Sequence, residues 1–281
     1  MTDYKKDGYV IVKNLFSKKR VEIIKEKAKQ FFDINSGIPD EFGPATFPGH
    51  YDYAIDNPHK YKQSTFFKEL IGDKEIVKHL VELIGENVKG MQTLIFQKKP
   101  GQRGTSWHQE EYYVPTRDKS LTGFWLALEN VNIQNGCMWF IPQSQRPGYF
   151  YAREEFLHLP NPEFHDNDTI KESIIKTLQP PVPIELEAGD AVFFNGYLIH
   201  CSYKNKSEDT RMALTIMYMS AESILTWDNN GKLKTRHPED MRDIVMVAGN
   251  DPYAWKGTEN IMPCWRRDIN NPVVKEHLHN K

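Results

Sequence analysis

Residues 122–142 read TGFWLALENVNIQNGCMWFIP. The stretch holds two short apolar runs, each rich in aromatic residues, with a polar turn containing Asn and Gly between them. Apolar runs of this length, bounded by Gly, Pro or Asn, predict β-strands. Further runs of the same kind lie on both sides of it, at 91–101, 106–114, 183–196, 198–203 and 211–220. Their number and spacing are typical of a β-sandwich or barrel.

In the chain before these strands, apolar residues recur mainly at helical spacing. After a strand-like stretch at 7–17, Ser17 is placed to cap a helix that runs to about residue 33, and a second helix is expected at 73–84. Helices ahead of many short strands indicate a mainly β fold with helices packed on its outside. We expect one domain over 1–281. Its parts are a helical region at 1–87, a β core at 88–220 and an irregular extension at 221–281.

The composition excludes several classes of protein. The 281 residues include 36 basic and 38 acidic ones, so the net charge is −2 and no basic field is available for nucleic acid. No apolar run is long enough to cross a bilayer, and the N-terminus lacks the pattern of a signal peptide. Three cysteines are too few and too scattered for a disulfide framework. We expect a cytoplasmic protein, monomeric or homodimeric, with a small-molecule partner.

The stretch SWHQEEYYV at 106–114 carries a candidate metal site. In a strand, His108 and Glu110 would point to the same face while Glu111 points to the other. His200 comes 92 residues later, and Arg211 follows it by eleven. Two His and one carboxylate leave open positions on Fe(II), as an oxygenase requires. A solvated sheet face or a buried polar pair would give the same spacing, so the pair alone is weak evidence. No HExxH motif of the zinc peptidases occurs.

The sequence resembles the phytanoyl-CoA dioxygenase family of Fe(II)/2-oxoglutarate oxygenases, which includes the ectoine hydroxylases. The resemblance covers roughly residues 3 to 220. It is carried by DGYVIVKNLFS, KKPG, WHQEEYY, GFWLALENVNIQNGCMWFIPQSQRPG and AGDAVFFNGYLIHCSYKNKSEDTRMALTIMY. It implies a double-stranded β-helix, or jelly-roll, core. The implied cofactor is Fe(II) bound by His108, Glu110 and His200, with 2-oxoglutarate and O2 as co-substrates.

The resemblance also implies roles for residues beside the metal. Arg211 is expected to hold the distal carboxylate of 2-oxoglutarate, since a planar guanidinium matches a carboxylate at two points. Ser202 and Gln97 are further candidates for the same co-substrate. Tyr112 is expected in the substrate pocket from its register, and His50 and Tyr51 from their place in an early aromatic loop. The segments 34–64 and 144–180 are expected to cover the mouth of the barrel and to set selectivity.

Two departures from the family pattern affect the expected activity. Glu110 stands where the family usually has Asp, although related oxygenases do use Glu, and an acid at this position argues against a halogenase. The turn PQSQR at 142–146 replaces the family's PGSHR, which suggests a different substrate.

The leading hypothesis is hydroxylation of a small-molecule metabolite with release of succinate and CO2. Desaturation, cyclisation or epimerisation at the same site remain alternatives, as does a non-catalytic metal-binding jelly-roll protein. A protein-modifying Jumonji oxygenase is disfavoured by the position of Arg211.

Overall fold

The computed structural model describes residues 3–32, 54–56, 65–155, 161–165, 168–223, 244–256 and 265–267. Its helices are α1 (Tyr4–Asp7), α2 (Lys18–Phe32), α3 (Phe66–Ile71), α4 (Lys74–Ile84) and α5 (Glu172–Ile175), with short 3-10 helices η2 (Glu110–Tyr112) and η3 (Ala254–Lys256). Its strands are β1 (Tyr9–Val12), β2 (Ala54–Asp56), β3 (Val88–Lys98), β4 (Thr122–Ala127), β5 (Met138–Phe140), β6 (Arg153–Glu155), β7 (Asp168–Ile170), β8 (Val182–Ile184), β9 (Ala191–Asn195), β10 (His200–Ser202), β11 (Arg211–Ser220), β12 (Val245–Ala248) and β13 (Trp265–Arg267).

Within these residues the strands form two facing sheets and a separate hairpin. The large sheet has the order β1-β9-β4-β11-β3-β2-β13, and β12 also pairs with β3. The small sheet has the order β10-β5-β8, and β6 pairs with β7 alone. All of these pairs are antiparallel. The arrangement is mainly β with flanking helices, and it confirms the expected jelly-roll class.

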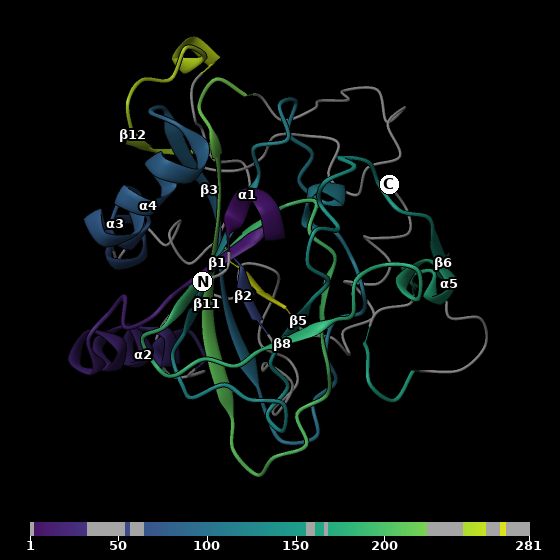
Figure 1. Cartoon of the computed structure of the whole chain (residues 1–281). Helices are drawn as coiled ribbons and strands as arrows, with labels where there is room; N and C mark the ends of the chain where they lie inside the picture. Colours follow the sequence, from purple (N-terminus) through teal and green to yellow (C-terminus); the bar gives the residue numbers. More distant parts are fainter. Residues whose placement is uncertain are drawn as a thin grey trace.

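Side-chain alternation along β11 separates two cores. Met212, Leu214 and Ile216 point toward the helices and join a cluster with α2, α3 and α4. Ala213 and Met217 point the other way, into a cluster enclosed between the large and small sheets. Figure 1 shows α2, α3 and α4 on one side of β3 and β11, with β6 and α5 on the other. The space between the sheets therefore receives every second residue of β3, β4 and β11.

The two helices predicted from the sequence are present, and Ser17 lies at the start of the first as predicted. Ser17 Oγ accepts from the backbone N–H of Arg20 at 3.3 Å at the start of α2, and Asp73 caps α4. The buried face of α2 consists of residues at helical spacing: Val21, Ile24, Ala28 and Phe31. Burying such side chains contributes roughly 1.5–3 kcal/mol each for the larger ones.

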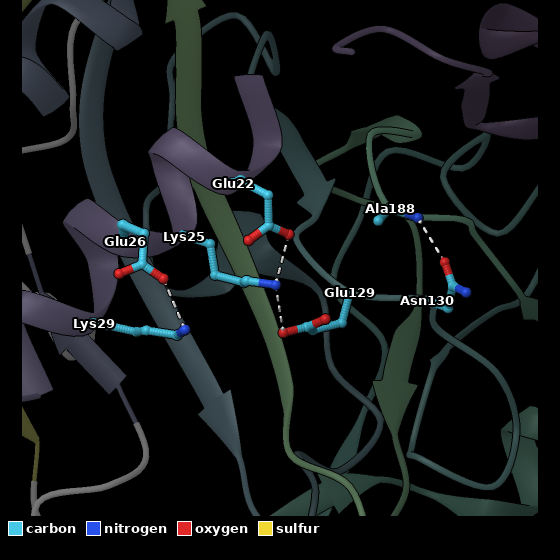
Figure 2. A network of polar contacts seen from close by, with 7 residues as sticks. All are labelled: Glu22, Lys25, Glu26, Lys29, Glu129, Asn130 and Ala188. Carbon is cyan, nitrogen blue, oxygen red and sulfur yellow. Dashed lines mark hydrogen bonds and ion pairs between the residues drawn. The ribbon is translucent and has the colours of Figure 1, made fainter. Parts of the chain in front are cut away.

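Polar contacts fix α2 to the strand ends beneath it. Figure 2 shows Lys25 of α2 between Glu22 of the same helix, at 2.8 Å, and Glu129 after β4, at 3.3 Å. The next residue, Asn130, accepts through Oδ1 from the N–H of Ala188 at 3.0 Å. These contacts join the helical layer to the loops on one edge of the sheet.

The structure differs from the sequence-based expectations in two places. The segment 106–114 is not a strand: His108 makes a single bridge to His200, and η2 begins at Glu110. The extension after residue 220 is not wholly irregular, because β12 and β13 add to the large sheet beside β3 and β2. Among the described residues, no helix has the length and apolar character needed to cross a membrane.

Candidate metal centre

Two buried histidines face each other across the chain. His108 and His200 exchange both backbone hydrogen bonds, at 2.9 and 3.0 Å, and their ring centroids lie 4.1 Å apart. His108 Nδ1 lies 2.7 Å from the carbonyl oxygen of Ser106, and His200 Nδ1 lies 2.9 Å from that of Leu198. A carbonyl oxygen only accepts, so each Nδ1 carries the hydrogen. Both Nε2 atoms are therefore left with a lone pair, which is the form that binds metals.

Glu110 brings a carboxylate to the same place. Its Oε2 lies 3.5 Å from His108 Nε2 and 3.9 Å from His200 Nε2. The carboxylate arrives from the first residue of η2 and not from a continuing strand. His108 and Glu110 thus share a side as expected, although the chain has already left the extended conformation at Glu110.

The three donors fit a divalent metal. One ligand atom from each of His108, Glu110 and His200 lies within 4.8 Å of the other two. Ligands with bonds of about 2.1 Å at right angles are about 3 Å apart, so a small inward movement closes the site on an ion. The set of two imidazoles and one carboxylate is the facial triad of non-haem iron oxygenases.

Burial favours the neutral form of His200, which is the form that binds metals. It lowers the pKa of His200 to about 3, and the neighbouring His108 acts in the same direction, while Glu110 and the Leu198 carbonyl oppose the shift. A neutral imidazole is thus present over the whole neutral range. Protons do not compete with a metal for this ligand near pH 7.

Two buried basic side chains of the large sheet lie near the candidate metal centre, next to Ser202 of β10 in the small sheet. Arg211 and Lys98 are cross-strand partners on β11 and β3, and their side chains are both almost fully buried. Lys98 Nζ donates to Ser202 Oγ at 2.9 Å and to the Tyr203 carbonyl at 2.8 Å. Burial holds the pKa of Lys98 well below its ordinary value, and the charge of Arg211 adds to this effect. Paired cations in a dry interior favour an anionic ligand.

Backbone and aromatic groups orient the cation pair. The carbonyl oxygen of Gly136 accepts from Arg211 Nη2 at 3.1 Å and from Lys98 Nζ at 3.4 Å. The guanidinium carbon of Arg211 lies 5.4 Å from the centroid of the Trp125 ring. Ser202 lies two residues beyond His200 on β10, so it links the metal centre to Lys98.

The register of β3 places Gln97 away from this pocket. Gln97 pairs with Met212, whose side chain belongs to the core under the helices, whereas Lys98 pairs with Arg211. Residues opposite each other in a sheet point to the same face. The register therefore places Gln97 on the helix-facing side of β3, and Lys98 is the residue of that segment whose side chain lies beside Arg211. Lys98 belongs to the KKPG motif that was noted in the sequence. Which residue of this segment faces the pocket depends on the alternation of side chains along β3, which the sequence alone does not place.

The aromatic residues after Glu110 are arranged differently from expectation. The ring of Tyr113, not Tyr112, lies against His108, with centroids 5.7 Å apart. Tyr112 contacts the Phe150 ring edge-on at 5.8 Å, and Phe150 is 45% exposed. Tyr112 thus lies between the surface and the metal centre, which is compatible with a role in substrate binding. His50 and Tyr51 fall outside the described residues.

Gln109, to which the sequence assigned no role, connects separate segments around the site by hydrogen bonds. It is buried between the two ligands of the HQE segment, and its Nε2 donates to the carbonyls of Tyr197 at 2.9 Å and Tyr149 at 3.1 Å. Its Oε1 accepts from the N–H of Tyr151 at 3.0 Å. Three chain segments around the metal centre are joined through this one amide.

The fold is a jelly roll, and its two histidines and one carboxylate form a candidate metal centre. Known proteins of this architecture resemble it. SnoK, described as a non-heme alpha ketoglutarate dependent carbocyclase from nogalamycin biosynthesis, aligns at 20% identity. The TM-score is 0.63, with 87% of this chain and 94% of that chain covered. EctD from S. alaskensis, solved with bound Fe, aligns at 19% identity with a TM-score of 0.62, covering 78% and 74% of the two chains.

The family is established by sequence. The model of the phytanoyl-CoA dioxygenase family matches residues 4–213, which is most of the chain, and the chain belongs to this family. Phytanoyl-CoA dioxygenase 1 of Oryza sativa subsp. japonica is 27% identical over 83% of this chain and 92% of that protein. The peroxisomal phytanoyl-CoA dioxygenase of Homo sapiens is 30% identical, but the alignment covers 53% of this chain and 44% of that protein.

Family membership settles the class of enzyme. The chain is a non-haem iron dioxygenase that uses 2-oxoglutarate and O2, as the sequence predicted. The single-domain division, the cytoplasmic location and the monomeric or dimeric state remain predictions.

Proposed function

We propose that this enzyme binds Fe(II) through His108, Glu110 and His200 and hydroxylates a small-molecule metabolite, converting 2-oxoglutarate to succinate and CO2. The proposal rests on the proximity of two features described above, the candidate metal ligands and the buried basic pair. A triad with both Nε2 lone pairs available lies next to a buried cation pair that suits a carboxylate. The metal centre and the anion pocket are connected through His200 and Ser202 on one short strand.

The residues of the anion pocket would bind the co-substrate. Arg211 and Lys98 would pair with the carboxylate of 2-oxoglutarate distal to the metal, and Ser202 Oγ would complete the contact. Trp125 covers the guanidinium and keeps water from it. When bound, iron supplies the activation of O2 against the 2-oxo acid and the oxidation of the substrate carbon. The protein supplies position, charge and exclusion of water.

The substrate would approach past the aromatic residues that follow Glu110. Tyr112 lies between Phe150 at the surface and Tyr113 at the metal centre. The balanced charge of the chain favours a metabolite over a polymer as the substrate. SnoK is named a carbocyclase, so ring closure at the same centre is the alternative outcome. A non-catalytic binding protein is disfavoured, because all three donors and both cations are in place.

An anaerobic titration of the metal-free protein with Fe(II) and then 2-oxoglutarate tests the proposal. We expect a saturable visible charge-transfer band from the chelated co-substrate, which His108→Ala abolishes and Arg211→Ala weakens. Succinate release with candidate metabolites then identifies the substrate, and analysis of the product separates hydroxylation from cyclisation. A folded protein that shows no band would contradict the proposal.

A further inference from the structure

The hairpin β6–β7, inside the 144–180 insertion, is docked on the segment that carries two of the three metal donors. Before His108, Ser106 Oγ donates to the carbonyl of Asp168 at 2.6 Å, and the N–H of Ile170 donates to the carbonyl of Trp107 at 2.9 Å. The hairpin therefore lies along the chain as it enters the metal centre.

The same hairpin holds the chain where it leaves the metal centre, through Arg153. Arg153 Nε donates to Asp168 Oδ2 at 2.8 Å across the hairpin, and its Nη2 donates to the Tyr113 hydroxyl at 3.3 Å. The guanidinium carbon lies 5.2 Å from the Tyr112 ring centroid and 5.9 Å from that of Tyr113. The side chain of Arg153 is only 13% exposed. One guanidinium thus contacts two successive tyrosines and a carboxylate.

We infer that Arg153 is a positioning residue for the metal centre, acting on Glu110 through the turn of η2. This inference rests on the proposed role of Glu110 as a metal ligand. The N–H of Tyr113 donates to the carbonyl of Glu110 at 2.9 Å, and the Tyr113 ring lies against His108. Holding Tyr112 and Tyr113 therefore fixes the backbone from which the Glu110 carboxylate extends.

The identity of the ligand explains why the turn needs such support. Glutamate has one more rotatable bond than aspartate, so its carboxylate depends more on a fixed backbone. Metal–ligand distances tolerate deviations of only about 0.2 Å. A planar guanidinium can pair with Asp168, reach a hydroxyl and stack on two rings at once, whereas the ammonium of lysine is a point charge.

Binding of Mn(II) to the metal-free protein, followed by loss of the free-ion signal in electron paramagnetic resonance, tests the inference without turnover. The variants are Arg153→Met, Arg153→Lys, Tyr113→Phe and the double variant Arg153→Met with Tyr113→Phe. Arg20→Met is the matched control. Arg20 pairs with Asp73 at 3.4 Å and lies 6.0 and 5.9 Å from the rings of Phe16 and Phe66, in the helical layer.

We expect Arg153→Met to raise the Kd for Mn(II) about tenfold or more, as removal of groups supporting metal ligands does. Arg153→Lys falls between wild type and Arg153→Met, and Tyr113→Phe gives a smaller loss. The double variant is no weaker than Arg153→Met, because both changes remove the same contact. Arg20→Met should bind Mn(II) within about twofold of wild type, even if its thermal stability falls as much as that of Arg153→Met.

Three results would overturn the inference. An unchanged Kd in Arg153→Met, with wild-type binding intact, removes Arg153 from the metal centre and leaves the proposed function standing. Equal losses of affinity in Arg153→Met and Arg20→Met would show a general effect of stability. Absence of Mn(II) binding in the folded wild-type protein would defeat the proposed function itself, and the inference with it.

Discussion

Lys98 and Arg211 face each other across two antiparallel strands, and both donate a hydrogen bond to the carbonyl oxygen of Gly136, at 3.4 and 3.1 Å. Two basic side chains are thereby held side by side in the interior, where burial and the charge of Arg211 lower the pKa of Lys98. Such an arrangement is costly by itself and becomes favourable once an anion bridges the pair. This is the property expected of a site that binds a dicarboxylic co-substrate, as proposed above.

Replacing Lys98 should weaken binding of 2-oxoglutarate without lowering the stability of the ligand-free protein. We expect Lys98→Met to raise the Kd for 2-oxoglutarate about 10- to 100-fold, because hydrogen bonds to charged groups contribute roughly 1.5–3 kcal/mol. The free energy of unfolding of the ligand-free protein should not fall, since the variant removes a buried charge. Calorimetric titration of the Mn(II)-loaded protein measures the first quantity and urea unfolding the second. The exposed neighbour Lys99, changed to Met, is the control; equal behaviour of the two variants would contradict the assignment.

Gly136 should tolerate substitution much less well than Gly101. It has a φ of +77°, and a Cβ there would lie 2.5 Å from the Tyr203 carbonyl oxygen. Gly101 has the same φ of +77°, but a Cβ there would meet no atom within 4 Å, so Gly101→Ala reports the backbone strain alone. We expect Gly101→Ala to cost about 1 kcal/mol and Gly136→Ala clearly more, beyond about 3 kcal/mol. Thermal unfolding of both variants checks the order, and equal costs would refute it.

The buried carboxyl of Glu111 should give the protein a recognisable pH dependence. Burial raises the pKa of Glu111 from 4.5 to about 8, although Thr116 donates to it from its backbone and its hydroxyl. The raised pKa favours the protonated native state, so this contribution to stability is complete below about pH 4.5. It is lost as pH rises toward 8, at about 1.4 kcal/mol per pH unit.

Glu111→Gln keeps an acceptor for Thr116 and removes the titration. We expect the difference in unfolding free energy between variant and wild type, in metal-free protein, to grow in favour of the variant between about pH 5 and pH 8. Urea unfolding at several pH values gives this difference. Parallel curves for the two proteins would show that Glu111 does not titrate in this range.

Gln109 should matter for stability although it is not one of the metal donors. Gln109→Met leaves the carbonyls of Tyr149 and Tyr197 and the N–H of Tyr151 without the side-chain amide that now satisfies them. Unsatisfied buried polar groups cost about 1–3 kcal/mol each, so a total loss of about 3 kcal/mol or more is expected. Gln97→Met, on the helix side of β3, is the control and should change the unfolding free energy by less than about 0.5 kcal/mol. Similar losses in the two variants would contradict the role of Gln109 in connecting these segments.

The sequence predicted the convergence of the three candidate donors better than the backbone conformation that brings them together. His108, Glu110 and His200 follow from residue type and spacing, and they do converge. The strand expected through Glu110 is absent, because tight pairing with His200 ends at His108 and the chain turns into η2. Glu111 was expected on the opposite face from Glu110. Its carboxyl is buried and accepts hydrogen bonds from the N–H and hydroxyl of Thr116, a contact that periodicity does not reveal.

The placement of Gln97 differs from expectation for another reason. A shift of one residue along a strand exchanges its two faces, and a sequence motif does not state where strand pairing begins. The pairing of Lys98 with Arg211 is a tertiary fact, decided by the long β3–β11 register with its bulge near Met217. Likewise, the contacts of Gln109 and Arg153 join segments about 40 residues apart or more, so no local pattern could identify them.

The docking of β6–β7 has a consequence for engineering. An insertion that borders the mouth of a barrel is a natural piece to transplant when a new substrate is wanted. Here the hairpin is joined to the chain on either side of His108 and Glu110. It is held by the hydroxyl of Ser106 and a backbone bond to Trp107 before them, and by Arg153 against Tyr112 and Tyr113 after them. If the hairpin sets selectivity as expected, a graft of the hairpin alone should also weaken metal binding, because it removes the contacts to 106–113. The transferable unit is the hairpin with residues 106–113, moved as a single cassette.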